Sequence, residues 1–199
     1  LEGNTTAGHV AVNAAATVAI GADAQADAVT LSGAQAELSA AGTVGTVTIA
    51  SDRNQLAVTG TVSAVEVTRD ASGTTVSAEA GGQIDAVSAA GAGMTVQGDG
   101  IVAKLAVSEG ASDITVNTTG TKIDNNSSEA VTAGTGSVEP GKAGTSQGAE
   151  QAPTQDGPSS GSDSDDSAGG GSNNSGGSGG SGSGDSGAEE EQQADIVKA

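Results

Sequence analysis

A short aliphatic motif returns at nearly regular intervals between residues 10 and 123. Its copies are Val44–Ile49, Val62–Val67, Ile84–Ala89 and Val102–Val107, and a second motif begins between them at Leu56, Thr74, Met94 and Ile114. The period is roughly 20 residues, and a fixed period of this size indicates stacked, similar units, each of which buries its apolar face only against its neighbours.

Within the repeats, apolar residues alternate with polar or small ones, as in His9-Val10-Ala11-Val12. Alternation with β-branched residues predicts short strands with one face turned inward, and the Gly, Asn and Asp residues between them supply turns. These features predict an all-β fold, a parallel β-solenoid of about six coils, whose handedness the sequence leaves open. A β-sandwich of hairpins is the alternative, but it offers no reason for one motif to return in register.

A solenoid stacks equivalent residues of successive coils above one another. We therefore expect two inward columns of side chains in the core. The first holds Val47, Val65, Val87 and Leu105, and the second holds Leu56, Thr74, Met94 and Ile114.

The large aliphatic residues divide the chain into parts. Residues 1–124 hold 28 Val, Ile, Leu and Met residues, whereas residues 125–199 hold four. We therefore expect a solenoid at 1–124 and a disordered Gly, Ser and Asp-rich linker at 125–187, because low apolar content cannot offset chain entropy. A short acidic segment at 188–199 has the character of the start of a truncated element. The repeat is already running at Val10, which favours a fragment of a longer protein.

The charge of the chain excludes several classes of partner. Its net charge is −19 with only six Lys and Arg residues, too few to neutralise a nucleic-acid backbone, and an anionic membrane surface would repel it. No apolar stretch is long enough to span a membrane. The chain also has no Cys, which excludes disulfides, thiolate metal sites and Cys nucleophiles.

Carboxylates on adjacent coils could in principle perform polysaccharide lyase or hydrolase chemistry. The candidate acids are scattered at Asp23, Asp27, Glu66, Asp70 and Asp85. Such chemistry would also need a cation beside the substrate, and the only arginines are Arg53 and Arg69. The single histidine, His9, has no nucleophile or orienting carboxylate near it in the sequence, and we expect it on the surface.

Other motifs are better explained by turns and strands than by sites. Gly98-Asp99-Gly100 loosely matches a dinucleotide fingerprint, but a strand follows it where a helix is required. Gly136–Ala143 falls one residue short of a phosphate-binding loop and lies within the expected linker. Threonines that suggest a flat array do not fall at one coil position, so ordinary strand propensity explains them better; they are Thr46, Thr48, Thr59, Thr61, Thr115, Thr118 and Thr119. Aromatic residues, on which sugars usually stack, are absent.

The strand sequences resemble β-helical segments of bacterial cell-surface proteins, the Gram-positive kind that carries S-layer homology domains. The runs that carry the resemblance are Thr43–Ile49, Leu56–Gly60 and Gly110–Ile123, followed by a Ser, Gly and Asp-rich linker. No S-layer homology motif is present. The resemblance implies a non-enzymatic surface role and transfers no functional residue to this chain.

Taken together, these features predict a structural stalk or spacer of a bacterial cell-surface protein, located outside the cell. We expect no enzyme activity, no catalytic, cofactor or metal residues, no nucleic-acid partner and no membrane insertion. The expected partners are a cell-envelope polymer, bound through a domain absent from this chain, and an extracellular glycan or protein. The first alternative is an adhesin or polysaccharide-binding β-helix, and the second is a β-helical lyase or hydrolase.

Overall fold

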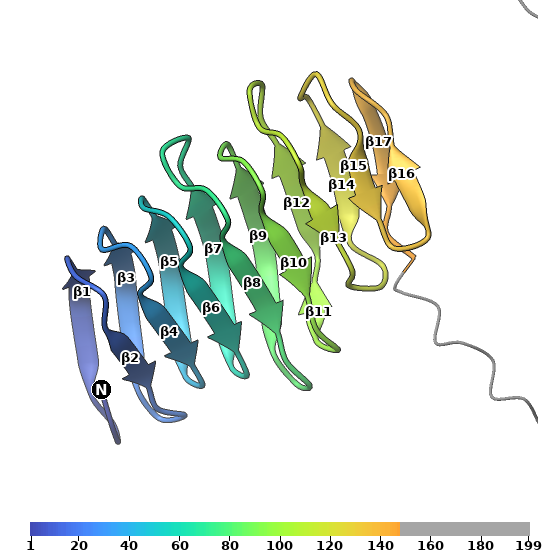
Figure 1. The fold of residues 1–199 in the computed structure, drawn as a ribbon. Coiled ribbons are helices and arrows are strands. Elements are labelled where there is room, and N and C mark those ends of the chain that lie inside the picture. Colours follow the sequence, from blue (N-terminus) through green and yellow to red (C-terminus); the bar gives the residue numbers. More distant parts are fainter. Residues whose placement is uncertain (148–199) are drawn as a thin grey trace, which may run out of the picture. The chain divides into compact units, whose positions relative to one another are not determined.

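The computed structural model describes residues 1–147, which form two β-sheets and contain no helix (Figure 1). We call them sheet A and sheet B. The strands of sheet A are β1 (Thr6–Val12), β3 (Gln25–Leu31), β5 (Thr43–Ile49), β7 (Thr61–Val67), β9 (Gln83–Ala89), β11 (Ile101–Val102), β12 (Lys104–Val107), β14 (Lys122–Asn125) and β17 (Lys142–Thr145). Those of sheet B are β2 (Thr17–Ile20), β4 (Glu37–Ala40), β6 (Gln55–Val58), β8 (Thr75–Ala78), β10 (Thr95–Gln97), β13 (Thr115–Val116), β15 (Val131–Ala133) and β16 (Gly136–Val138).

The chain alternates between the two sheets, so one strand of sheet A and the next strand of sheet B make one coil (Figure 1). Each strand pairs in parallel with its equivalent in the following coil, from β1 to β14 in sheet A and from β2 to β15 in sheet B. The predicted parallel β-solenoid is confirmed, with about seven turns rather than the six that the sequence suggests. We number the coils from the one that contains β1 and β2.

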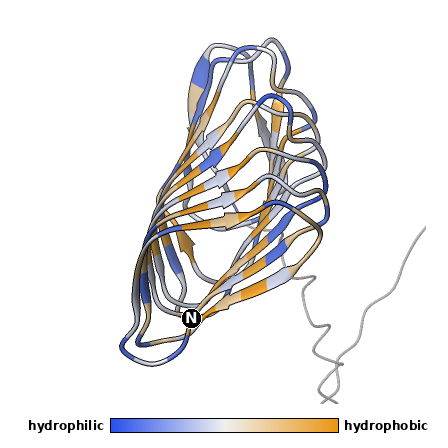
Figure 2. Cartoon of the chain, turned by 90° about the vertical axis from the view of Figure 1, so that its left-hand side faces the viewer, coloured by the Kyte–Doolittle hydropathy of each residue, from blue (hydrophilic) through white to orange (hydrophobic). Residues whose placement is uncertain are grey.

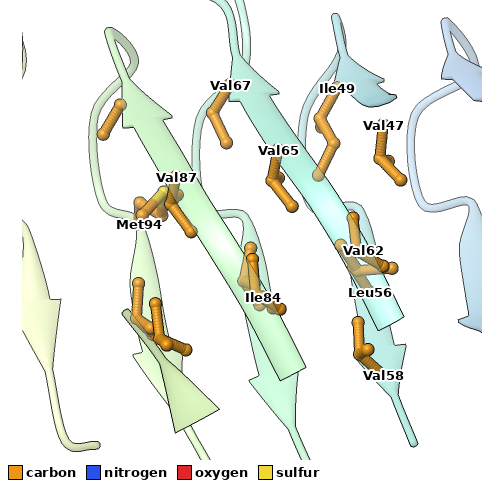
Figure 3. Close-up of a cluster of buried hydrophobic side chains, with 14 of the residues drawn as sticks. Val47, Ile49, Leu56, Val58, Val62, Val65, Val67, Ile84, Val87 and Met94 are labelled. Atoms are coloured by element: carbon orange, nitrogen blue, oxygen red, sulfur yellow. The ribbon is translucent and has the colours of Figure 1, made fainter. Parts of the chain in front are cut away.

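The core consists of aliphatic columns that run through the stack. Val47, Val65, Val87 and Leu105 pair in sequence, which confirms the first predicted column, and Val29 and Ile123 extend it at its two ends. All six side chains are at most 1% exposed. Figure 3 shows part of this column together with Leu56 of β6 and with Met94, which lies just before β10.

Strict alternation fails at one place in each long strand of sheet A. In β5 the inward residues are Val44, Val47 and Ile49, so two successive residues, Gly45 and Thr46, face outward. The same order of buried and exposed residues returns in β3, β7 and β9. This change of face explains why the repeated motif has apolar residues three and then two positions apart.

The second predicted column is buried, but Leu56 does not belong to it. Thr74, Met94 and Ile114 are at equivalent positions of successive coils, and Asn54 is their equivalent in the preceding coil. Leu56 pairs instead with Val76. The cause is the turn between β7 and β8, residues 68–74, which is two residues longer than the turn between β5 and β6, residues 50–54. The prediction used the spacing between Val44 and Val62. Counted from Leu56, that spacing leads to Thr74, two residues before the true partner Val76.

The two corners of each coil are stacked as regularly as the strands. At the corner from sheet A to sheet B, residues 35, 53, 73, 93 and 113 all have positive φ, between 53° and 68°. Gln35, Arg53 and Asp113 adopt this conformation without being glycine. At the other corner Gly60 is required for space, because a Cβ there would lie 2.2 Å from the carbonyl oxygen of Gly42. Figure 2 looks along the stack at both corners.

The last strands close the C-terminal end of the solenoid. β17 pairs antiparallel to β14, and β16 pairs antiparallel to β15, so both sheets end in a reversed strand. The buried Asn125 fastens this cap, since its Nδ2 donates to the carbonyl oxygens of Glu129 and Val138, both at 2.8 Å. Its Oδ1 accepts hydrogen bonds from the backbone N–H and the hydroxyl of Ser127.

The cap corrects the predicted boundary at residue 124. Strands continue to Thr145, and Val131 and Val138 are buried between them. Glycine and polar residues dominate these short strands, which is why their composition is that of a linker. Residues 148–199 lie outside the described part of the chain, and with them most of the predicted linker at 125–187 and the whole predicted segment at 188–199.

The N-terminal end of the stack differs from the capped end. Val10 and Val18 of the first coil are half-buried, whereas their equivalents Val29 and Leu38 in the second coil are fully buried. The N-terminal amino group of Leu1 donates to the carbonyl of Ala19 at 2.8 Å, and this contact covers the end of β2. Within residues 1–147, no strand lies on the outer side of β1.

Val65→Asp tests the register of the core. Val65 is 1% exposed, so the variant places an unpaired carboxylate between Val47 and Val87. We expect the free energy of unfolding to fall by at least about 3 kcal/mol, measured by denaturant titration followed by far-UV circular dichroism. Thr61→Asp adds the same charge to the exposed face of the same strand and should cost less than about 0.5 kcal/mol. Equal losses in the two variants would contradict the register.

Thr74→Val tests a buried hydroxyl. Thr74 is 1% exposed and its Oγ1 has no hydrogen-bond partner among the described protein atoms. A buried polar atom without a partner costs about 1–3 kcal/mol, and valine has nearly the shape of threonine. We therefore expect the variant to be more stable, by about 1 kcal/mol, and to unfold at higher denaturant concentration. Thr75→Val on the outer face is the matched control and should change little; a destabilised Thr74→Val protein would mean that the hydroxyl is satisfied.

Candidate functional site

The outer face of sheet B carries a shallow groove. It has a volume of about 250 Å³ and runs along coils one to five. Hydroxyl, amide and carboxyl groups line it above a floor of small residues; most of these polar side chains are exposed or half-exposed, and Ser77 is buried. The side chains that define it are Glu37, Ser39, Gln55, Ala57, Ser77 and Gln97.

The groove is distinct from a second hollow of about 330 Å³ that lies beside the C-terminal cap. Asp124, Asn126 and Lys142 line that second hollow together with Asn125. The side-chain amide of Asn125 is already fully used in holding the cap, as described above. We therefore take the hollow beside the cap as part of the cap, and the groove on sheet B as the candidate site.

Strand register explains why sheet B is hollowed. Two columns of side chains face outward, and the one formed by Glu37, Gln55 and Thr75 makes a wall. Beside it Ser39, Ala57 and Ser77 form a column of small side chains, which is the floor. Gln97 follows Ser77 in this second column, and its longer side chain also lines the groove.

The chemistry of the groove is that of hydrogen bonding rather than of proton transfer. Hydroxyls and side-chain amides both donate and accept hydrogen bonds, and here they repeat at the coil spacing of about 4.8 Å. Glu37 is the ionisable side chain of the lining, and its Oε2 accepts a hydrogen bond from the Thr17 hydroxyl at 3.2 Å. Glycoside hydrolysis uses a pair of carboxylates, and the lining supplies one.

Threonines do stack on the outer face of sheet B, at a position that the sequence did not single out. Thr75, Thr95, Thr115 and Thr132 pair in succession. On sheet A, Thr43 pairs with Thr61 in the same way. Of the threonines considered from the sequence, Thr115 alone belongs to the column on sheet B, and the others do not share its coil position. Unequal turn lengths hide the column, because the step from Thr115 to Thr132 is shorter along the sequence than the two steps before it.

The structure brings Arg53 and Arg69 to the same corner of the solenoid, between sheet A and sheet B. The hydrogen bonds that form at this corner connect turns of different coils. Arg69 Nη2 donates to the carbonyl oxygen of Glu109 at 3.4 Å, and Asp52 Oδ1 accepts from the Ser72 backbone N–H at 2.8 Å. Asp70 is exposed at this corner. These contacts give no observation in favour of a lyase or hydrolase.

The other candidate carboxylates lie away from this corner. Asp27 and Asp85 are exposed on the outer face of sheet A, with β5 and β7 between their strands, and Glu66 is exposed on the same face. Asp23 is exposed in the turn before β3. The register therefore does not place Asp27 and Asp85 on adjacent coils, as paired catalysis would require.

His9 lies on the exposed face of β1, as the sequence predicts. Its Nε2 is 3.0 Å from the Thr30 hydroxyl of the next coil. Gly98-Asp99-Gly100 forms the turn between β10 and β11, which confirms the interpretation as a solenoid turn. Gly136–Ala143 does not lie in a linker, because it spans β16, a turn and the start of β17.

Two further observations concern metals and membranes. Residues 1–147 contain no group of three or more His, Cys, Asp or Glu side chains placed to hold a metal ion. Over the same residues, no helix has the length and apolar character needed to cross a membrane.

Comparison with protein-family models, with curated proteins and with solved structures gives no match.

Asp52→Asn tests the hydrogen bonds of the corner through their pH dependence. The hydrogen bond from the Ser72 hydroxyl, the bond from the Ser72 N–H and the nearby Arg53 lower the pKa of Asp52 below its ordinary value. A lowered folded-state pKa stabilises the fold at pH values above the unfolded-state pKa, and this contribution is lost as the pH falls through the folded-state pKa. We therefore expect the variant to be less stable than the parent at neutral pH.

The difference in stability should shrink as the pH falls below about 4, the ordinary pKa of aspartate, and is read from urea titrations at several pH values. Ser72→Ala removes one donor and should reproduce part of the effect. A difference between Asp52→Asn and the parent that does not change with pH would contradict this account.

Proposed function

We propose that the chain is a non-enzymatic structural spacer of a bacterial cell-surface protein, located outside the cell. The likeness of Thr43–Ile49 and Gly110–Ile123 to β-helical segments of such proteins supports the bacterial surface role. The solenoid supports the mechanical role. In this proposal the spacer connects to a cell-envelope polymer through a domain outside this sequence.

The uninterrupted core is the observation that carries the proposal. The column from Val29 to Ile123 passes through six successive coils, and hydrogen-bonded strands run beside it in both sheets. The strands of each coil pair only with strands of the neighbouring coils, so the number of coils sets the length of the stack at about 4.8 Å per coil. A stack built in this way separates its two ends by a fixed distance, which is what a spacer must do.

Duplicating one coil tests the spacer. A second copy of residues 43–60 inserted after Gly60 repeats β5, β6 and their corners in register. We expect the insert to fold and the solenoid to lengthen by about 4.8 Å, measured as the distance between labels on β3 and β14. A Gly and Ser-rich insert of the same length is the control and should not give this defined increase. A duplicated coil that leaves the distance unchanged would count against the spacer.

Surface location is tested on intact bacteria that express the parent gene. Protease added to whole cells should release peptides of this chain while a cytoplasmic marker stays intact. Detection of the chain only after the cells are lysed would overturn the proposed location and leave the architecture untouched.

The groove on sheet B favours a second function, the binding of an uncharged polysaccharide. Its wall and floor present amides and hydroxyls at a regular spacing, which suits the hydroxyl groups of an extended polymer. The net charge of −19 disfavours anionic polymers. The chain has no aromatic residue for stacking, so in this proposal binding rests on several weak hydrogen bonds along the polymer.

Replacing the groove amides tests this second function. Gln55→Ala with Gln97→Ala removes two amides from the groove, and we expect weaker retention on immobilised neutral polysaccharides. Gln25→Ala with Gln83→Ala removes two exposed amides from the outer face of sheet A and is the matched control. If the parent protein binds no neutral polysaccharide, or both double variants bind equally, the groove is not a glycan site and the spacer proposal is unaffected.

A further inference from the structure

The groove on sheet B contains one polar side chain that is almost completely buried. Ser77 is 9% exposed, whereas the other polar side chains of the lining are exposed or half-exposed. Among the described residues, the lining side chains make one hydrogen bond within the protein, from the Thr17 hydroxyl to Glu37 Oε2. The Ser77 hydroxyl therefore lines the groove without a protein partner. A buried hydroxyl without a partner is unfavourable, so this position suits a bound group that supplies the missing hydrogen bond.

The neighbours of Ser77 in the floor column leave room for such a group and also limit its extent. Ala57, in the coil before, carries only a methyl group, and Gln97, in the coil after, carries a long side chain that also lines the groove. The lining comes from β2 to β10, and β13 contributes no residue to it. The groove therefore spans four steps between coils, about 19 Å, which accommodates a short segment of a ligand.

The groups of the lining fit a carbohydrate better than a peptide. The strands β4, β6 and β8 below the groove are paired on both sides, so a peptide cannot add to them as a further strand. Hydroxyls and side-chain amides both donate and accept hydrogen bonds, and the hydroxyls of a sugar do the same. A sugar hydroxyl can therefore pair with Ser77 whichever of the two groups donates.

We propose that Ser77 is the specificity-determining residue of the groove, and that its hydroxyl pairs with one hydroxyl of a short segment of a neutral glycan. This inference rests on the polysaccharide-binding function proposed above. A buried polar group that is paired only by a matching ligand hydroxyl discriminates against a ligand that lacks this hydroxyl. The exposed amides of Gln55 and Gln97 stay accessible to water when no ligand pairs with them, so they discriminate less.

Calorimetric titration of the full chain with neutral oligosaccharides tests the role of Ser77. The probes are glucose, mannose, galactose and N-acetylglucosamine oligomers of increasing length. We expect binding whose affinity increases with length until the groove is filled and then stays constant. Ser77→Ala should weaken binding by about 2- to 10-fold, the loss of one hydrogen bond, and should fold as the parent does. Ser63→Ala removes an exposed hydroxyl from the outer face of sheet A and should bind as the parent does.

Deoxy oligosaccharides separate a direct contact from a change in structure. In the parent, replacing one particular ligand hydroxyl by hydrogen should weaken binding, and in Ser77→Ala the same replacement should have little further effect. A variant that is merely misfolded would weaken both ligands alike and leave the ratio of their affinities unchanged.

The outcomes distinguish this inference from the proposal on which it rests. A parent that binds none of the oligosaccharides would overturn both the glycan site and the role of Ser77. A parent that binds, with Ser77→Ala equal to it in affinity or in discrimination against the deoxy ligands, would overturn the role of Ser77 and leave the groove as a glycan site.

Discussion

The pairing of each coil with the next, in both sheets at once, is the constraint on which the rest of this structure depends. Neighbouring strands lie about 4.8 Å apart, and this distance decides which residues fit at each position. Aliphatic side chains stack on their equivalents inside, as Val47 does on Val65. Gly60 is required at its corner because the carbonyl oxygen of Gly42 in the coil before leaves no room for a Cβ.

The same constraint explains how a core without aromatic residues holds the fold. No single side chain is large, but every inward position between Val29 and Ile123 in this column has an equivalent neighbour above and below it. Backbone hydrogen bonds accompany these contacts along the whole stack. The exception is the C-terminal end of the described stack, where β16 and β17 reverse direction and cap both sheets.

Much of the fold could be predicted from the sequence, because residues that pair between successive coils are of similar type and therefore recur along the chain as a repeated motif. The column through Val65 followed from the spacing of its motif. The partner of Leu56 did not, because a corner can gain two residues without changing the strands on either side of it. The cap was missed because Asn125 and its neighbours are polar, and their order comes from hydrogen bonds whose distant partners no local pattern reveals.

The groove on sheet B was hidden for a similar reason. The wall formed by Glu37, Gln55 and Thr75 exists only once the register is known, since these residues are unequally spaced along the sequence and share no side-chain type. The absence of a catalytic constellation was expected from the sequence and remains a prediction.

The unequal length of the corners has a consequence for how such a chain can change over time. The turn after β7 is two residues longer than the turn after β5, yet the strands that follow both stay in register. Insertions and deletions at the corners therefore leave the stack intact, whereas a one-residue change inside a strand would turn its inward side chains outward. Apart from positions such as Gly60 that have no room for a side chain, the corners can change in length while the strands stay nearly fixed, so new surface loops can arise in this solenoid without a new fold.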